Sequence, residues 1–187
     1  MKRLSILFFL IFAPFSLWSE NNGDVYLGFG LGYEHGNITD QGATAWRLLV
    51  EYDYSYPLTY NFYLVPAVQL SFSQMSSRAA PTPPVLSLLW LNVPLRFKYE
   101  LLVKKNAFFD IECGIFGGMR LAGCDDITDN NKYYHESNRF DTGPVIRIGP
   151  RFNRLSFKFE GQFGLCKTDS SVRDNLSFIS LLIGYRF

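Results

Sequence analysis

The side chains of this 187-residue chain that could carry chemistry are thirteen charged residues that alternate with apolar ones. Successive side chains of a β-strand point to opposite faces, so the charges would share one face and the apolar residues the other. In a closed barrel with the charged face inside, all thirteen would line the lumen. This predicted lumen network has eight basic and five acidic members: Arg47, Glu51, Asp53, Arg96, Lys98, Asp110, Glu112, Arg120, Arg147, Arg151, Lys158, Glu160 and Arg186.

The narrow lumen of such a barrel limits what these charges can do. An unpaired ion buried in a protein is very unfavourable, so charges in a narrow lumen have to pair with one another. The sequence therefore favours a salt-bridge network that plugs the lumen. The excess of basic residues leaves a second interpretation open, in which the lumen is a narrow path that slightly prefers anions.

Two histidines are the remaining candidates for catalysis. His35 has Asp40 nearby, and His135 has Ser137 nearby. A histidine beside a hydroxyl or a carboxylate can act in general acid–base or nucleophilic catalysis. Neither spacing forms a motif, and both histidines fall in segments rich in turn-forming residues. The sequence therefore predicts no enzyme activity and no catalytic residue.

An acidic segment offers a candidate for metal binding. Asp125, Asp126 and Asp129 lie in the longest predicted loop, at about 122–141. Their carboxylates could bind a divalent ion, but the segment lacks the glycine and the distal glutamate of a calcium-binding loop. We therefore predict neither a metal site nor a cofactor site.

Eight stretches have the period-two alternation of β-strands. The turn-forming connections after the odd stretches are roughly eight to twenty residues long, and those after the even ones roughly two to six. Transmembrane barrels have short periplasmic turns and longer outer loops. The predicted fold is therefore all-β, an eight-stranded antiparallel transmembrane up-and-down β-barrel. The strands are expected at about 23–34, 43–56, 60–74, 85–100, 107–121, 142–152, 155–165 and 175–187.

Three local features refine this prediction. Pro57-Leu58-Thr59 is expected to form the turn after the second strand. Pro66 and Pro94 each remove a hydrogen-bond donor from a sheet without free edges, so we expect bulges there. A soluble lipocalin-like barrel is the alternative fold, and it would place the apolar stripes inside.

The chain begins with a predicted export signal. Lys2 and Arg3 precede an apolar run from Leu4 to Trp18, which is short for a spanning helix and typical of a signal peptide. We predict cleavage after Ser19, so that residues 1–19 are the signal peptide and residues 20–187 the barrel domain. An uncleaved helical anchor is the alternative. Removal of residues 1–19 lowers the count of Lys plus Arg from 18 to 16 against 17 acidic residues. The resulting net charge of −1 argues against a nucleic-acid partner.

The three cysteines leave at least one unpaired. Cys113 is expected in mid-strand, facing lipid, as a free thiol. Cys124 and Cys166 are both expected near the outer rim. An oxidising compartment would allow them to form a disulfide, and the sequence leaves open whether they do.

The C-terminal residues resemble a known signal. Leu181, Ile183, Tyr185 and Phe187 share one parity, and they are similar to the C-terminal signal of bacterial outer-membrane barrels. That resemblance implies recognition by the barrel-assembly machinery. The segment 91–99, LNVPLRFKY, is similar to a recurring strand of the small outer-membrane β-barrel family, the porin-like group with OmpA- and OmpX-type eight-stranded members.

The resemblance implies a location in the cell outer membrane, in contact with its lipid. It favours a structural or interaction role, in which surface-exposed loops bind an extracellular ligand or host protein, as in an adhesin or surface antigen. A narrow porin-like channel for small solutes or ligands is the alternative. Some members modify lipids of the outer leaflet with a histidine and a serine or aspartate, so an enzyme of that kind is a third, less favoured interpretation.

Overall fold

The computed structural model describes residues 23–35, 43–76, 85–125, 140–165 and 175–186. Within these ranges, no helix is long and apolar enough to cross a membrane. The predicted signal peptide at 1–19 lies outside them. The described residues form nine strands: β1 (Gly23–His35), β2 (Ala43–Tyr54), β3 (Tyr56–Thr59), β4 (Phe62–Ser76), β5 (Val85–Lys104), β6 (Ala107–Asp125), β7 (Phe140–Phe152), β8 (Leu155–Phe163) and β9 (Asn175–Arg186).

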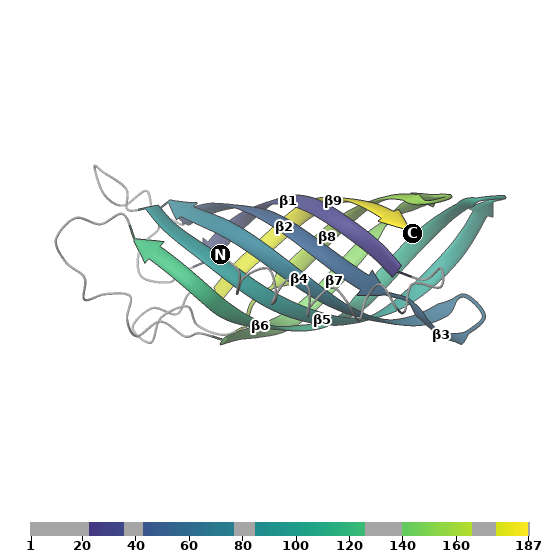
Figure 1. The fold of residues 1–187 in the computed structure, drawn as a ribbon, viewed down its shortest axis with the longest axis horizontal. Helices are drawn as coiled ribbons and strands as arrows, with labels where there is room; N and C mark the ends of the chain where they lie inside the picture. The colour runs from purple at the N-terminus through teal and green to yellow at the C-terminus, as the bar shows by residue number, and fades with distance from the viewer. Residues whose placement is uncertain (1–22, 36–42, 77–84, 126–139, 166–174, 187) are drawn as a thin grey trace, which may run out of the picture.

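These strands close into a barrel (Figure 1). Each pairs antiparallel with its neighbours, and β9 returns to pair with β1, where Ile183 lies opposite Leu27. The short β3 follows β2 after Ser55 and pairs with β4, so it extends an existing wall strand. The wall therefore has eight strands, and the predicted eight-stranded antiparallel barrel is confirmed.

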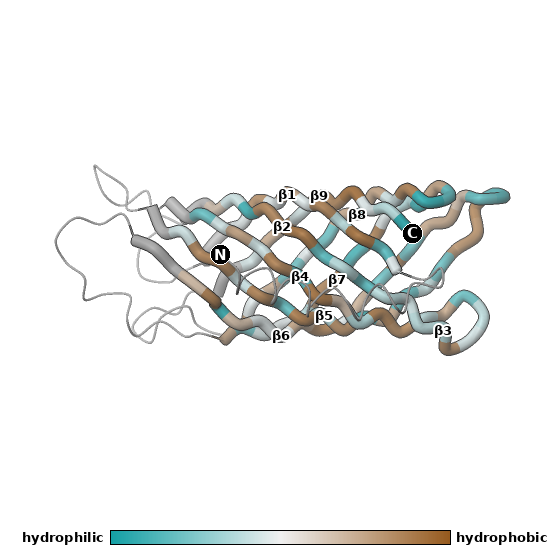
Figure 2. The backbone as a smooth tube through the Cα atoms, viewed as in Figure 1, coloured by the Kyte–Doolittle hydropathy of each residue, from teal (hydrophilic) through white to brown (hydrophobic). Residues whose placement is uncertain are grey.

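Hydrophobic and hydrophilic residues alternate along the strands (Figure 2), and their exposure shows that the two faces of the wall have opposite polarity. On β1, the outward side chain of Leu27 is 62% exposed, while on β2 the inward Arg47 is 2% exposed. The same alternation runs along β7 and β8. A soluble barrel would bury the apolar stripes, so the soluble alternative is wrong. An apolar exterior around a polar interior is the arrangement of a membrane barrel.

Asparagine sets the short turns. Asn61, Asn106 and Asn153 have positive φ angles of 64°, 72° and 53°, a region that asparagine tolerates better than most residues. The turn predicted at Pro57-Leu58-Thr59 is therefore wrong. Those residues belong to β3, and the chain reverses at residues 60–61, where Asn61 supplies the left-handed conformation.

The bulges predicted at Pro66 and Pro94 are also wrong. Pro66 lies opposite Leu95, and the pairing of β4 with β5 keeps the same register on both sides of the prolines. In that register Pro94 falls next to Pro66 across the ladder. The two missing donors therefore interrupt one short stretch of the sheet without displacing it. A register shift occurs instead at Leu89 and Trp90, opposite β6.

Candidate functional site: the lumen charge network

The structure brings most of the predicted lumen network together. Eleven of its thirteen members are buried, the exceptions being Arg120 and Arg186, which are half-buried. They project inward from β2, β5, β6, β7 and β8, because every second residue of those strands faces the lumen. Eight strands enclose an interior only wide enough for side chains to fill it. These charges therefore meet across the barrel.

Glu51 is the acidic centre of the network. Its carboxylate accepts a hydrogen bond of 2.7 Å from Arg96 Nη2 and one of 2.8 Å from Arg147 Nη2. Arg96 Nη1 and Gln69 Nε2 also donate to it, at 3.3 Å and 3.1 Å. The Glu51 side chain is 0% exposed, so protein groups replace its hydration. Two arginines on different strands are thus held by one carboxylate of β2.

Glu160 on β8 is the second buried acceptor. Arg147 donates to it from Nε at 3.2 Å and also from Nη2. Arg47 Nη2 reaches Glu160 Oε1 at 3.2 Å and Ser180 Oγ at 2.6 Å. Arg47 also donates to Gln162. Arg147 therefore bridges Glu51 and Glu160, which lie far apart in the sequence and share one cation.

A third group of ion pairs surrounds Arg96 and Lys158. Arg96 Nε lies 2.9 Å from Glu112 Oε2, and its Nη2 lies 3.1 Å from Asp53 Oδ2. Lys158 pairs with Glu112 and lies 3.2 Å from Asp110 Oδ2. These contacts join β2, β5, β6 and β8, so the network continues from the centre of the lumen toward the end with the short turns.

Two acidic members of the network are missing from the set that the sequence predicts. Asp24 accepts from Arg186 Nε at 2.8 Å. Glu100 lies 2.9 Å from Lys98 Nζ and 2.8 Å from Arg151 Nη2. A signal for both exists in the sequence, because Asp24 has the parity of the inward Tyr26 and Glu100 that of the inward Lys98. Both lie near strand ends, where alternation alone does not show how far the lumen extends.

With these two residues the ion-paired lumen is electrically balanced. The ion pairs described above, together with those of Arg47, Arg147 and Arg151, join seven acids to seven bases, and each of these fourteen charges has a partner of opposite sign. These ion pairs therefore show no basic excess, because Asp24 and Glu100 add two acids to those predicted from the sequence. Arg120 lies half-buried toward the outer end of β6 and has an interaction of its own there.

Aromatic and apolar side chains occupy the space beside the ions. The guanidinium carbon of Arg147 and the ammonium of Lys158 each lie 5.1 Å from the ring centre of Tyr26. Arg47 lies 4.4 Å from the ring centre of Phe178. Cations over aromatic faces gain further electrostatic stabilisation when they are desolvated. Phe178 packs with Ala45 and Leu88 above the central ion pairs, on the side of the long loops.

Glycine makes room for these large groups. A Cβ on Gly30 would lie 2.3 Å from Ser180 Oγ, the acceptor of Arg47. A Cβ on Gly184 would lie 2.2 Å from the ring of Tyr26. The small residues of β1 and β9 therefore serve the packing of the lumen.

Several predicted sites lie outside the described residues. His135, Asp126, Asp129 and Cys166 fall in undescribed segments, as does Phe187 of the predicted assembly signal. His35, Cys124 and Asp125 end described strands, but their side chains are not described. No group of three or more metal-ligating side chains occurs in the described part of the chain.

The described assembly-signal residues, Leu181, Ile183 and Tyr185, all face outward from β9. Cys113 is exposed on the apolar exterior as a free thiol.

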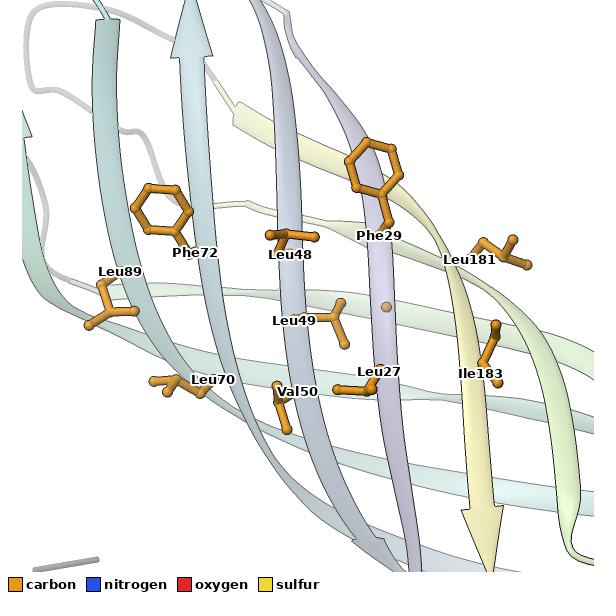
Figure 3. A pocket seen from close by; sticks show the side chains of 11 residues that line it. Leu27, Phe29, Leu48, Leu49, Val50, Leu70, Phe72, Leu89, Leu181 and Ile183 are labelled. Carbon is orange, nitrogen blue, oxygen red and sulfur yellow. The ribbon is translucent and has the colours of Figure 1, made fainter. Parts of the chain in front are cut away.

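An apolar depression lies on the wall at β9, β1, β2, β4 and β5 (Figure 3). It has a volume of about 610 Å³, and its lining includes Phe29, Leu48, Phe72 and Leu181. Ligand pockets usually combine apolar walls with a few polar groups that fix orientation. This lining has no polar side chain, so the depression has no group to orient a substrate.

The fold matches solved structures of outer-membrane proteins. Neisserial surface protein A superposes with a TM-score of 0.57 at 8% identity, over 88% of this chain and 97% of that one. OprG from Pseudomonas aeruginosa gives 0.54 at 10% identity, over 89% and 96%. The outer membrane enzyme PagL gives 0.51 at 16% identity, over 87% and 98%.

At these low identities the superpositions show a shared fold, which is that of the small eight-stranded outer-membrane β-barrels. No protein-family model matches the sequence, and no curated protein is significantly similar to it. The fold is found in a surface protein and in an enzyme, so the role of this chain has to be argued from its own residues.

Proposed function

We propose that this chain is a bacterial outer-membrane barrel whose lumen is sealed by the charge network and whose role is structural or interactive. In this proposal residues 1–19 direct export, and residues 181–187 are read by the barrel-assembly machinery. The barrel anchors four outer segments, which would bind an extracellular ligand or host protein as those of an adhesin or surface antigen do.

The balanced, paired lumen is the observation that carries the proposal. A channel needs a continuous polar path in which ions exchange partners with water. Here the central carboxylate of Glu51 is held by Arg96, Arg147 and Gln69, with no exposed surface. An ion crossing the lumen would have to separate such pairs, and breaking one buried pair costs about 3–5 kcal/mol. This network favours the sealed barrel over the narrow anion-preferring channel.

The exterior and the topology support the location. Leucine, isoleucine, valine and phenylalanine side chains cover the outside of the wall, so lipid is the medium that suits it. The four segments 36–42, 77–84, 126–139 and 166–174 join β1 to β2, β4 to β5, β6 to β7 and β8 to β9. The described strand ends that these segments connect lie at one end of the barrel, which we assign to the cell surface because outer loops are the longer ones.

An enzymatic role is not part of the proposal. PagL shares the fold, but a fold carries many functions and catalysis depends on a particular site. The lumen residues are engaged in ion pairs, and the apolar depression lacks a polar side chain. Lipid A from cells that make this chain should keep the acyl pattern of cells without it, as measured by mass spectrometry. A chain-dependent loss or gain of an acyl group would contradict the non-enzymatic role.

Planar-bilayer recording of the refolded protein tests the sealed lumen. We expect no defined conductance steps from wild type, because the paired side chains fill the interior. The double variant Glu51→Gln, Glu160→Gln removes the negative charge of the two carboxylates that Arg147 hydrogen-bonds and should introduce unstable conductance in the same lipid. Regular wild-type steps with anion selectivity would overturn the proposal and favour the channel.

The interaction role needs a separate test. Each of the four outer segments is replaced in turn by a glycine–serine linker of equal length, and binding of the cells to host cells or matrix is measured. We expect at least one replacement to abolish binding while leaving the amount of folded barrel unchanged. Equal binding by all variants and by cells without the protein would contradict the role.

A further inference from the structure

The end of the barrel with the short turns carries exposed basic residues. Lys104 and Lys105 lie at the turn between β5 and β6, and Arg154 lies at the turn between β7 and β8. All three are exposed. In Figure 1 the β5–β6 turn lies at the right-hand end of the barrel. None of the three forms an ion pair within the described part of the chain.

These basic residues belong to one connected rim. The backbone N–H of Asn153 donates to the carbonyl oxygen of Asn106 at 2.9 Å, which joins the β7–β8 turn to the β5–β6 turn. The N–H of Arg186 donates to the carbonyl oxygen of Arg154 at 2.8 Å, which joins the end of β9 to the β7–β8 turn. Lys105 and Arg154 thus lie in two adjacent turns, each beside an asparagine of the hydrogen bond that joins those turns.

The acidic residues at this end do not neutralise the rim. Asp24, Asp53, Glu100 and Asp110 are all buried, and each is already within an ion pair of the lumen. Their charges are therefore balanced internally. Among the described residues, the exposed charges of the rim are positive.

The rim also borders directly on the apolar exterior. Just before Lys104, Leu102 is 62% exposed and Val103 is 71% exposed. Arg154 Nη1 donates to the hydroxyl of the outward Tyr185 at 3.5 Å, so its side chain lies along the outside of the wall. Lysine and arginine beside apolar surface extend their charged ends toward the membrane interface. In the proposed membrane location, their charges lie at the depth of lipid headgroups.

We propose that Lys104, Lys105 and Arg154 bind the phosphates of anionic phospholipids in the leaflet that faces the short turns. Positive side chains near a membrane surface attract anionic lipids through charge, and arginine binds phosphate through paired N–H donors. The apolar residues beside the rim receive the acyl chains of the same lipids. This inference rests on the proposed membrane location and goes beyond it by naming a lipid class and the residues that select it.

Electron paramagnetic resonance with spin-labelled lipids tests the inference. The barrel is reconstituted in phosphatidylcholine with traces of spin-labelled phosphatidylglycerol or phosphatidylcholine, and the motionally restricted fraction of each is measured. At low salt we expect wild type to prefer phosphatidylglycerol about fivefold at the rim, the effect of one well-placed cation. Salt at ~1 M should remove the preference through screening.

The matched variants separate charge from folding. The triple variant K104Q/K105Q/R154Q should show equal restriction of the two lipids, while K104R/K105R/R154K should keep the preference. The inference would be overturned if folded wild type restricted the two lipids equally. It would also be overturned if the glutamine variant kept the preference for phosphatidylglycerol. Failure of wild type to insert into bilayers would instead contradict the proposed location.

Discussion

At the scale of single residues, the lumen depends on shared partners. Arg147 contacts both Glu51 and Glu160, and Arg96 contacts Glu51, Asp53 and Glu112. Loss of one carboxylate therefore affects more than one cation. A buried ion pair adds little over an apolar pair of the same size, but loss of one partner leaves an uncompensated charge.

Glu51→Gln tests this dependence. The amide keeps the shape but removes the negative charge between Arg96 and Arg147. We expect the free energy of unfolding to fall by about 3–5 kcal/mol, measured by urea unfolding in lipid vesicles.

Glu100→Gln is the matched control for that measurement. It makes the same chemical change at the rim, where the side chain of Glu100 remains 7% exposed beside Lys98 and Arg151. Water can reach this group more easily, so we expect a smaller loss. An unchanged urea midpoint for Glu51→Gln would indicate a hydrated lumen instead.

At the scale of elements, the approach of β7 to β8 depends on a glycine. The two strands keep one register, but the ladder has no paired residues at Gly149 and Pro150. A Cβ at Gly149 would lie 2.0 Å from the carbonyl oxygen of Phe157. Backbone cannot yield as a flexible side chain can, so this position requires glycine.

Gly149→Ala should therefore destabilise the barrel by about 1–3 kcal/mol or more, the usual effect of overpacking. Gly117→Ala is the control, because a Cβ at Gly117 meets nothing within 4 Å. That control should be neutral or slightly stabilising, since alanine lowers the entropy of the unfolded chain. Equal urea midpoints for the two variants would show that Gly149 does not lie this close to the backbone of Phe157 in the folded barrel.

The closing strand β9 carries another prediction. Leu181, Ile183 and Tyr185 face outward, and the parity of Phe187 would continue that stripe. Deletion of Phe187 removes one aromatic side chain, so the refolded barrel should lose only about 1–3 kcal/mol. In cells, the amount of assembled protein should fall sharply if this residue is read by the assembly machinery. Wild-type levels of assembled protein would contradict the proposed signal.

At the scale of the whole molecule, closure makes the barrel a single cooperative unit. β9 pairs with both β1 and β8, so none of the described wall strands is an edge strand. Ion pairs across the lumen connect β2 to β7 and β8, which are far apart in the sequence. Removal of any one strand would expose both backbone groups and charges to lipid.

Closure predicts resistance to detergent. Unheated protein should migrate on a denaturing gel differently from heated protein, and cell fractionation should recover it with the outer membrane. Glu51→Gln should lower the temperature at which the folded band is lost, while Gly117→Ala should leave it unchanged. A soluble periplasmic monomer would be incompatible with the apolar exterior.

The sequence by itself determined the wall. Alternation such as that of Leu27 and Phe29 against Gly28 fixes which face meets lipid, because a strand has only two faces. Asparagine and other turn-formers mark the ends of strands, so eight strands and their up-and-down order follow. Inward parity also identifies eleven of the buried charges. Asp24 and Glu100 have the same inward parity within the expected strands 23–34 and 85–100, but alternation does not show whether a charge so near the end of the barrel lies inside the lumen or beyond it.

Only the tertiary structure decided which charges meet. Arg47 finds Glu160, 113 residues away, and Arg147 finds Glu51, 96 residues away. Both ion pairs form across the lumen, and which residues meet there depends on how the tilted strands are staggered around the barrel. Alternation fixes the face of a residue but not its height or the partner opposite it. The ion pairs that fill the lumen, and the equal numbers of acids and bases within them, therefore arise only when the sheet closes.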